Sequence, residues 1–225
     1  MQNDPILPFL LMALLGYVVG SISPTYLLGR WVGGLDLRAY GSGNVGGSNV
    51  GVWAGRWATV VGGLLDVTKG ALPTWLALRW ALGLEGAVVA GLATVVGHDW
   101  SLFLRFRGGR GLATALGFLL VVAPWGWLPL LGGLALGYAL HGTAIGALAG
   151  VVLLPVISLW THRPQPVILG CIALLFIVIL KRLEANRLPF PRDYSRGSVL
   201  LNRLLLDRDI REYEAWIRRT PDLRA

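Results

Sequence analysis

The sequence contains a single cysteine, Cys171, and only three histidines. Cys171 lies within an apolar run, so we expect neither a disulfide framework nor a thiolate metal cluster. His98, His141 and His162 are isolated from one another and lack the spacing of metal ligands, so no metal site is expected. Metal-dependent and thiol-dependent redox chemistry is therefore not predicted, and no cofactor is called for.

Charged residues are also scarce. They make up 14% of the 225 residues, whereas 55% are hydrophobic, which leaves too little polar surface for a soluble globule of this size. The composition therefore predicts an integral membrane protein. The net charge of +8 is compatible with nucleic acid, but the arginines gather at the ends of apolar segments and in the tail. Contact with anionic lipid headgroups, or a topology signal, explains them better than nucleic acid does.

The first apolar run, residues 6–29, is long enough to cross a bilayer as a helix. It lacks a positive n-region and a small-residue cleavage site, so we expect a retained span and not a cleavable signal peptide. Pro24 predicts a bend near its end. The second run, residues 52–80, is expected to be one helix or a broken pair, with Pro73 ending a helix just beyond Lys69.

Residues 84–97 form the next apolar run, and residues 112–180 are nearly free of charge. Prolines and turn residues predict four short helices in the latter segment, with interruptions at Pro124, Pro129, the His141 region, Pro155 and residues 161–166. Glycines 142, 146 and 150 recur every four residues, a spacing that permits close helix packing.

The pattern predicts an all-α polytopic membrane protein of about seven transmembrane helices. Arginines concentrate in residues 30–56 and 105–110 and in the tail, whereas the opposite loops hold only Arg79 and Arg163. By the positive-inside rule, the N-terminus lies outside and the C-terminus lies in the cytoplasm. We expect a transmembrane domain over residues 1–186 and a basic amphipathic cytoplasmic tail over residues 187–225.

Residues 41–49, Gly-Ser-Gly-Asn-Val-Gly-Gly-Ser-Asn, are the least hydrophobic stretch between the first two runs. Glycines that bring backbone N–H groups close to a ligand, together with uncharged donors, suit an anion such as phosphate. The stretch also matches a dinucleotide fingerprint, but no hydrophobic strand precedes it and Asp66 lies in an apolar helical segment. A flexible connector between two membrane helices remains the alternative to the anion cradle.

Asp66 and Lys69 lie three residues apart within an apolar segment, on one face of a helix. Ionisable residues inside a membrane segment are functional candidates. Lys69 is therefore either a second phosphate ligand or half of a structural ion pair in the bundle interior.

The second unusual stretch, residues 97–111, combines arginines and glycines beside an aromatic cluster. Arginine binds phosphate through two parallel hydrogen bonds. Arg105 and Arg107 alternate with apolar residues and are expected to anchor headgroups, whereas Arg110 lies between two glycines as a ligand residue would. His98 is a helix cap, a ligand donor or a base, and the sequence does not separate these roles.

A third polar cluster, residues 181–187, follows the last apolar run on the same predicted cytoplasmic side. Three polar clusters are therefore expected to converge on one face. In the tail, Leu206, Ile210, Tyr213 and Ile217 recur at helical spacing among arginines. This pattern fits a helix lying on the inner leaflet, or an ordinary solvated amphipathic tail.

Several motifs, in order and spacing, resemble those of the bacterial membrane acylphosphate:glycerol-3-phosphate acyltransferases. They are Gly20-Ser-Ile with Tyr26-Leu-Leu-Gly-Arg30, Gly41-Ser-Gly-Asn-Val-Gly46 to Asn49, Asp66-Val-x-Lys-Gly70, and Gly97-His through Phe103-Leu-x-Phe-x-Gly-Gly to Ala113-Thr114. The similarity extends to about Asn186. It implies a seven-helix enzyme of the bacterial cell membrane with its active site facing the cytoplasm.

The resemblance implies transfer of a fatty acyl group from acyl phosphate to the 1-hydroxyl of glycerol 3-phosphate, giving lysophosphatidic acid and phosphate. This is the first step of phospholipid synthesis, and it implies a functional link to the enzyme that forms acyl phosphate. Because acyl phosphate is already activated, neither a covalent nucleophile nor a metal is needed.

The resemblance also implies site residues. The catalytic set is Ser42, Asn44, Asn49, Lys69, His98 and Arg110. The substrate-binding set is Gly41, Gly43, Gly46, Ser48, Asp66, Gly108, Gly109, Gly111, Arg182 and Asn186. The first loop would hold the donor phosphate or carbonyl, Lys69, Arg110 and Asn186 would serve phosphates, and His98 would support the second loop.

The chain also departs from the family pattern. Members usually carry lysine where Arg110 stands and threonine where Ser48 stands, and Val52 and Leu183 replace a basic residue and a histidine. Arg56 or Arg182 are candidate substitutes on the acceptor side. A different acyl acceptor, or a non-catalytic relative that binds or carries an anionic lipid or phosphate compound, is the alternative prediction.

Overall fold

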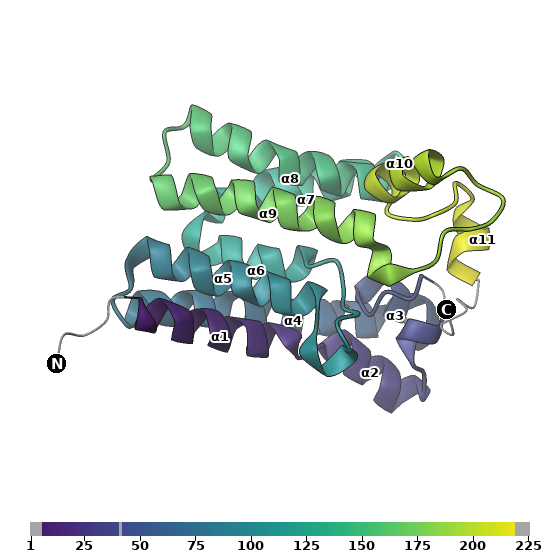
Figure 1. Ribbon diagram of the computed structural model, residues 1–225, viewed down its shortest axis with the longest axis horizontal. Coiled ribbons are helices and arrows are strands. Elements are labelled where there is room, and N and C mark those ends of the chain that lie inside the picture. The colour runs from purple at the N-terminus through teal and green to yellow at the C-terminus, as the bar shows by residue number, and fades with distance from the viewer. Residues whose placement is uncertain (1–5, 41, 219–225) are drawn as a thin grey trace.

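The computed structural model describes residues 6–40 and 42–218, and within these ranges it contains helices and no strands (Figure 1). The α-helices are α1 (Leu7–Ser21), α2 (Pro24–Gly33), α3 (Gly47–Ala54), α4 (Arg56–Arg79), α5 (Gly83–Asp99), α6 (Leu112–Val122), α7 (Trp127–Ala139), α8 (Thr143–Trp160), α9 (Gln165–Glu184), α10 (Arg196–Leu206) and α11 (Tyr213–Arg218). Short 3-10 turns are η1 (Leu37–Ala39), η2 (Leu102–Leu104), η3 (Pro124–Gly126) and η4 (Ala185–Arg187). The predicted all-α class is confirmed.

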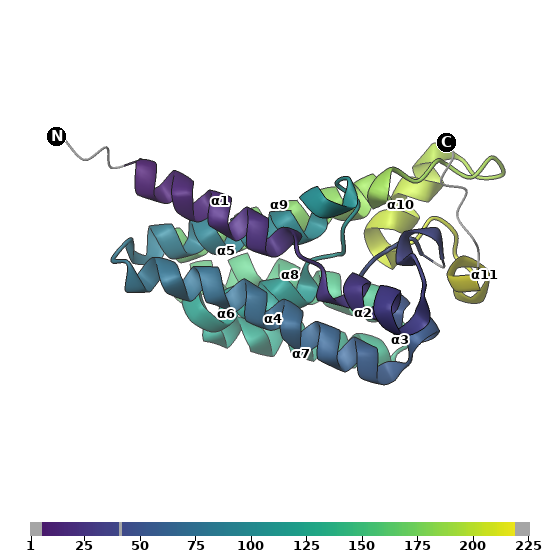
Figure 2. The same cartoon turned by 90° about the horizontal axis from the view of Figure 1, so that it is seen from below.

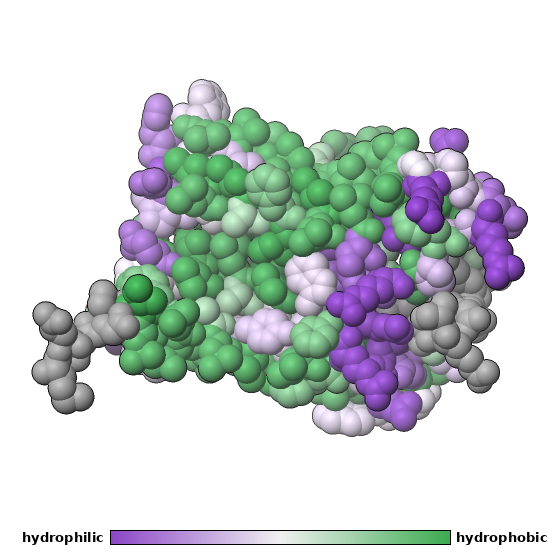
Figure 3. Space-filling model, viewed as in Figure 1, coloured by the Kyte–Doolittle hydropathy of each residue, from purple (hydrophilic) through white to green (hydrophobic). Residues whose placement is uncertain are grey.

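Helices α1 and α4 to α9 run side by side along the long axis of the molecule (Figures 1 and 2). Large apolar side chains stand exposed on their outer surface, among them Leu10, Leu14, Leu64, Phe176 and Leu180. Figure 3 shows a broad hydrophobic band over the bundle, while hydrophilic residues gather toward the end that carries α10 and α11. A band of this extent is the surface of a protein that lies in a bilayer. We call the end with α2, α3, α10 and α11 the polar end.

Four segments are long and apolar enough to cross a membrane by length and composition: Leu7–Gly33, Gly83–Leu104, Thr143–Trp160 and Gln165–Arg187. Helices α4, α6 and α7 lie beside them in the bundle, but α4 is less apolar and α6 and α7 are shorter. The number of seven spans and their orientation therefore stay predictions.

The first apolar run is bent, as Pro24 predicts. Helix α1 ends at Ser21, Ile22 and Ser23 are extended, and Pro24 opens α2. The hydroxyl of Ser23 accepts a hydrogen bond from the backbone N–H of Tyr26 and so caps α2. Proline is tolerated here because its missing N–H would have no partner in the first turn of a helix.

The second run is a broken pair, because α3 and α4 meet at Gly55, whose φ of +92° suits glycine alone. The expectation that Pro73 ends a helix is wrong, since α4 continues through it to Arg79. The Thr74 hydroxyl donates to the Gly70 carbonyl oxygen at 2.7 Å within this stretch. Neighbouring helices and such side-chain bonds let proline remain inside a membrane helix.

Four helices fill residues 112–180 as predicted, but Pro129 lies in the first turn of α7 and Pro155 lies inside α8, and neither interrupts its helix. The glycine spacing serves close packing of α7 on α8 at two of its three positions. A Cβ on Gly146 or Gly150 would collide with the backbone carbonyls of Gly133 or Pro129. Gly142 belongs instead to the turn before α8, and a Cβ there would meet only ordinary contacts.

The tail differs from the single helix that its spacing indicates. Helix α10 stops at Leu206, Asp207 takes a left-handed conformation with φ of 56°, and α11 begins only at Tyr213. The chain turns there because Asp209 is buried and forms an ion pair with Arg203 at 2.6 Å, which folds residues 207–212 back on α10. Helix α10 packs on α8 and α9, so the tail contacts the bundle.

The interior is built from α5, α6, α8 and α9. Val95, Phe118, Leu154 and Leu174, one from each of these helices, belong to the largest cluster of buried apolar side chains. This core fixes the ends of α5 and α9, which carry two of the three polar clusters, relative to each other.

Candidate active site

The first glycine loop is held in shape by Asn49 in the first turn of α3. Its side-chain Nδ2 lies within hydrogen-bond distance of the carbonyl oxygens of Leu37, Tyr40 and Asn44, at 3.1, 3.0 and 2.9 Å. Asn49 is fully buried, so these bonds are shielded from water. The loop is thus tied at several points, and this favours the anion cradle over a flexible connector.

Within this loop, backbone and side chains form two successive turns. The Asn44 N–H donates to the Ser42 hydroxyl at 3.3 Å, and the Asn44 side-chain Oδ1 accepts from the Gly46 N–H at 3.0 Å. Gly43 between them has φ of +66°. Asn44 is buried, whereas Ser48 is exposed on α3. Gly41 lies outside the described residues. The loop runs directly into the N-terminus of α3, where free amides attract anions.

A surface ion pair supports the approach to this loop. Arg38 and Asp36 lie 2.7 Å apart, and the Asp36 carboxylate also accepts from the Arg38 backbone N–H, which caps η1. The hydrogen bond from the Arg38 side chain holds the pKa of Asp36 below its ordinary value. Asp36 therefore stays charged and keeps η1 in place.

The second glycine loop folds back on the end of α5. The N–H groups of Gly108 and Gly109 donate to the carbonyl oxygens of Asp99 and His98, at 3.1 and 3.0 Å. A Cβ on Gly108 would collide with the His98 carbonyl oxygen, and one on Gly109 would collide with the His98 imidazole Nε2. Gly111, with φ of +66°, starts α6 directly afterwards. Only glycine allows this approach.

Asp66, Lys69 and His98 form a buried polar group between α4 and α5. The Lys69 ammonium lies 2.9 Å from Asp66 Oδ1, and His98 Nδ1 lies 3.3 Å from the same oxygen. Lys69 also donates to the carbonyl oxygens of Gly20 and Ile22, at 3.0 and 2.6 Å. These carbonyls are freed where α1 ends. The three donors of the ammonium thus meet three acceptors, an arrangement that favours a structural role for Lys69.

Asn186 joins both glycine loops to the end of α9. Its Nδ2 donates to the carbonyl oxygens of Gly108 at 3.1 Å and Gly43 at 3.4 Å, and its Oδ1 accepts from the Lys181 ammonium at 2.7 Å. Asn186 has a left-handed backbone with φ of 56°, which turns its side chain inward after α9 ends. The predicted convergence of the three polar clusters is present at this contact.

Arg110 faces the tail as well as α9. One terminal N–H group of its guanidinium, on Nη1, donates to the Lys181 carbonyl oxygen at 2.9 Å, and its Nε lies 2.9 Å from the Asp207 carboxylate. Arg182, in contrast, donates to the carbonyl oxygens of Leu204 and Ala144. The structure therefore brings Arg110 to the loops, whereas Arg182 connects the tail to α8.

Asp99 and Lys181 lie among these groups, although no role for either is predicted from the sequence. Asp99 is fully buried, neither of its carboxylate oxygens has a hydrogen-bond partner among the described residues, and it interacts electrostatically with Lys181 and Arg110. The Lys181 ammonium lies 3.0 Å from Glu184 and 4.9 Å from the centre of the Trp100 ring. Their position as ionisable residues at the ends of apolar runs is the sequence feature that could have identified them as site candidates.

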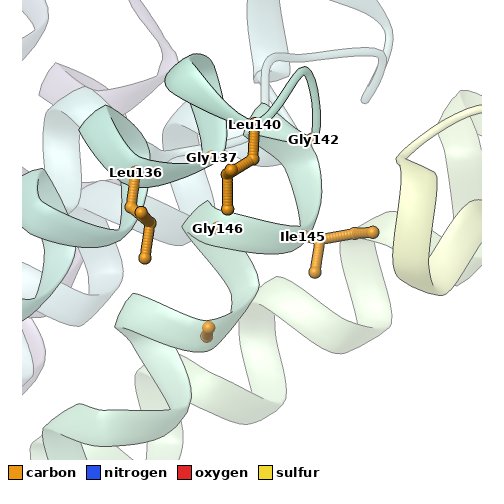
Figure 4. A pocket seen from close by; sticks show the side chains of 7 residues that line it. Leu136, Gly137, Leu140, Gly142, Ile145 and Gly146 are labelled. Atoms are coloured by element: carbon orange, nitrogen blue, oxygen red, sulfur yellow. The ribbon is translucent and has the colours of Figure 1, made fainter.

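A cavity lies apart from these clusters, against the α7–α8 hairpin (Figure 4). Its volume is about 290 Å³, and its lining carries no charged side chain. The residues around it are Leu136, Gly137, Leu140, Gly142, Ile145, Gly146 and Ala149. The polar clusters and this cavity are separate features of the molecule.

The arrangement suits anionic ligands at a membrane surface. Two glycine loops, the N-terminus of α3 and the cationic groups of Arg110 and Lys181 meet at the polar end of an apolar bundle. Backbone amides and guanidinium groups recognise phosphate. The dinucleotide interpretation does not hold, because the described chain around residues 42–49 is helical and loop-like and no strand leads into it.

The chain is similar to known proteins over most of its length. A family model described as glycerol-3-phosphate acyltransferase matches residues 10–189. A protein named glycerol-3-phosphate acyltransferase 5, from Dehalococcoides mccartyi, is 42% identical over 220 residues, which are 95% of this chain and 94% of that protein. Another, named glycerol-3-phosphate acyltransferase, from Myxococcus xanthus, is 41% identical over 174 residues, which are 68% of this chain and 91% of that protein.

Among solved structures, the fold is similar to that of PlsY (YgiH), described as an integral membrane glycerol 3-phosphate acyltransferase. Its glycerol 3-phosphate form superposes with a TM-score of 0.70 at 28% identity, covering 78% of this chain and 88% of that chain. The lysophosphatidic acid form gives a TM-score of 0.68 at 27% identity with the same coverage.

Proposed function

This chain belongs to the glycerol-3-phosphate acyltransferase family and is a membrane acyltransferase, and we propose that it moves a fatty acyl group from acyl phosphate to the 1-hydroxyl of glycerol 3-phosphate. In this reaction the hydroxyl oxygen forms a bond to the acyl carbonyl carbon, and the bond from that carbon to the phosphate oxygen breaks. Phosphate leaves with the electron pair and, overall, takes up the proton that the hydroxyl loses, and lysophosphatidic acid is formed.

The observation that carries this proposal is the meeting of both glycine loops at Asn186. One carboxamide contacts the carbonyl oxygens of Gly43 and Gly108, so the loops lie side by side at the polar end. The reaction has two phosphates, one on the donor and one on the acceptor. Two adjacent anion-binding loops, next to a bilayer surface that accepts the fatty chain, meet this requirement.

The roles of the residues follow from their surroundings. The first loop, with Ser42, Gly43 and Asn44, would hold the donor phosphate or carbonyl, because its amides lead into the N-terminus of α3. The second loop, with Arg110, would bind the acceptor phosphate. Asn49 shapes the first loop and His98 packs under the second, so both would act on substrate through the backbone that they support.

The test is acyl transfer by the purified protein in detergent or a bilayer. Palmitoyl phosphate is supplied with glycerol 3-phosphate, then with other polyol phosphates, and both phosphate release and lipid product are measured. We expect lysophosphatidic acid that depends on glycerol 3-phosphate and is strongly reduced in Asn44→Ala and Arg110→Ala. Product with another polyol phosphate alone would assign a different acceptor, and no product with any acceptor from folded protein would overturn the proposal.

We propose further that the polar end faces the cytoplasm of a bacterial cell membrane. Arg30, Arg56 and the arginines of the second loop lie in segments at this end, whereas Arg79 at the end of α4 and Arg163 in the turn before α9 lie at the opposite end. The positive-inside rule then gives the orientation. Acyl phosphate is a reactive mixed anhydride, so the protein would depend on an enzyme that forms it at the same membrane.

A further inference from the structure

Asp207 from the tail contacts Arg110 in the second glycine loop. Its carboxylate Oδ1 lies 2.9 Å from Arg110 Nε, and the two side chains are 23% and 12% exposed. A pair that is largely screened from water is stronger and better ordered than a surface pair. The family model ends at residue 189, so this carboxylate comes from beyond the part of the chain that the model matches.

The contact acts together with a second one to fix the plane of the guanidinium. Nε forms an ion pair with Asp207 Oδ1 that lacks hydrogen-bond geometry, and Nη1 donates a hydrogen bond to the Lys181 carbonyl oxygen at 2.9 Å. Together, the hydrogen bond at one nitrogen and the ion pair at another restrict rotation of the planar fork about its side-chain axis. The other Nη protons of the fork are then presented in one direction, as two-point binding of a phosphate requires.

The segment that supplies Asp207 is firmly docked. Arg203 pairs with Asp209 at 2.6 Å, both side chains are buried, and Arg203 also donates to the carbonyl oxygens of Leu183 and Leu188. From the other side, Arg182 in α9 donates to the Leu204 carbonyl oxygen at 2.8 Å. The carboxylate is therefore presented by a fixed turn and not by a loose end of chain.

We propose that Asp207 is a positioning residue for acyl transfer, which orients the Arg110 guanidinium to receive the phosphate of the acceptor. The inference rests on the function proposed above and adds the tail to the acceptor site. An opposite role is conceivable on charge alone, because a carboxylate beside Arg110 competes with an incoming phosphate. The buried anchoring of the segment argues against a carboxylate that must leave before substrate binds.

The experiment separates kcat from KM for each substrate. Asp207→Asn keeps the shape of the side chain and removes its charge, and Asp193→Asn makes the same change at an exposed tail position. We expect KM for glycerol 3-phosphate to rise roughly tenfold in Asp207→Asn, as loss of one ion pair that is largely screened from water predicts. KM for palmitoyl phosphate and all constants of Asp193→Asn should match the parent protein.

A double-mutant cycle tests whether Asp207 acts through Arg110. Lysine has no Nε or planar fork to orient. In an Arg110→Lys background, Asp207→Asn should therefore leave KM for glycerol 3-phosphate nearly unchanged. An equal loss in both backgrounds would show that the tail is merely structural and would overturn the inference. So would a lower KM or a higher kcat in Asp207→Asn, since both indicate a competing carboxylate.

Failure of a variant to fold and failure of the proposed function can each be distinguished from failure of the inference. If Asp207→Asn fails to fold, Asp207→Glu replaces it, because this variant keeps the charge but shifts the carboxylate. A raised KM for glycerol 3-phosphate in folded Asp207→Glu protein supports the inference. Kinetic constants equal to those of the parent protein contradict it. If the parent protein transfers no acyl group to any acceptor, the proposed function fails and the inference fails with it. Active parent protein with an unaffected Asp207→Asn variant overturns the inference alone.

Discussion

Asn186 Nδ2 donates a hydrogen bond to the Gly108 carbonyl oxygen at 3.1 Å and thereby joins the end of α9 to the second glycine loop. The same nitrogen lies 3.4 Å from the Gly43 carbonyl oxygen in the first loop. The relative position of two loops that are distant in the sequence thus depends on one buried carboxamide.

Replacing this donor should impair catalysis more than stability. In Asn186→Asp the carboxylate retains the shape but faces two carbonyl oxygens without a proton, so the loops separate. We expect kcat/KM for acyl transfer to fall by roughly a hundredfold or more, the cost of misplacing reacting groups by about 1 Å. Steady-state kinetics with palmitoyl phosphate and glycerol 3-phosphate provide the measurement.

Arg192→Gln is a suitable control for this variant, because Arg192 is exposed and close to the same region of the chain. It should retain parent-like kinetics. An Asn186→Asp protein with unchanged kcat/KM would show that the carboxamide does not set the loop positions.

Gly109→Ala should abolish the close packing of the second loop on α5. The new methyl group would collide with the His98 imidazole, and the ring cannot move freely because its Nδ1 faces Asp66. We expect at least a tenfold loss of kcat/KM, since each 1.4 kcal/mol of lost transition-state stabilisation is about tenfold. Gly63→Ala in α4 is the matched control, because a Cβ there meets nothing within 4 Å. Equal activity of the two variants would contradict the packing argument.

Lys69→Met tests whether the buried lysine is structural. Its removal leaves the Asp66 carboxylate and the freed carbonyls of Gly20 and Ile22 without the ammonium. Breaking a buried pair in this way costs about 3–5 kcal/mol. We expect the midpoint temperature of thermal unfolding in detergent to fall clearly. Arg79→Met, at the exposed end of α4, should leave this midpoint nearly unchanged. A stable Lys69→Met protein with a raised KM for either substrate would instead support a phosphate-binding role.

The orientation in the membrane can be tested with a membrane-impermeant maleimide. The single cysteine, Cys171, is buried, so background labelling of the parent protein should be low. Arg163→Cys in the turn before α9 should be labelled from outside intact cells, and Arg192→Cys at the polar end should be labelled only after the membrane is opened. The reverse pattern would place the active site outside the cell.

Composition and the order of the motifs were sufficient to predict the fold class and the meeting of the polar clusters. The shortage of charge indicates a membrane protein, turn residues indicate four helices over residues 112–180, and the spacing of the polar clusters indicates that they meet. Local proline rules misplaced helix ends at Pro73 and Pro155, because packing by neighbouring helices overrides them. The assignments of individual site residues remain predictions.

The contacts that define the site could not be predicted, because they join residues far apart in the chain. Nothing near Arg110 in the sequence indicates that Asp207 is its partner. The left-handed turn at Asn186 was not predictable either, because no glycine occupies that position. Lys69 illustrates the same limit. Its pairing with Asp66 follows from helical spacing, but its bonds to the α1–α2 bend depend on how the helices pack.

The position of Asp207 in the chain also has a consequence for biosynthesis. Helices α6 to α10 lie between Arg110 and Asp207 in the sequence, so a ribosome must complete all five before the two side chains can meet. The contact therefore forms only after the apolar helices α6 to α9 have been synthesised. A nascent chain that stalls within α9 would carry both glycine loops but would lack the carboxylate that holds Arg110.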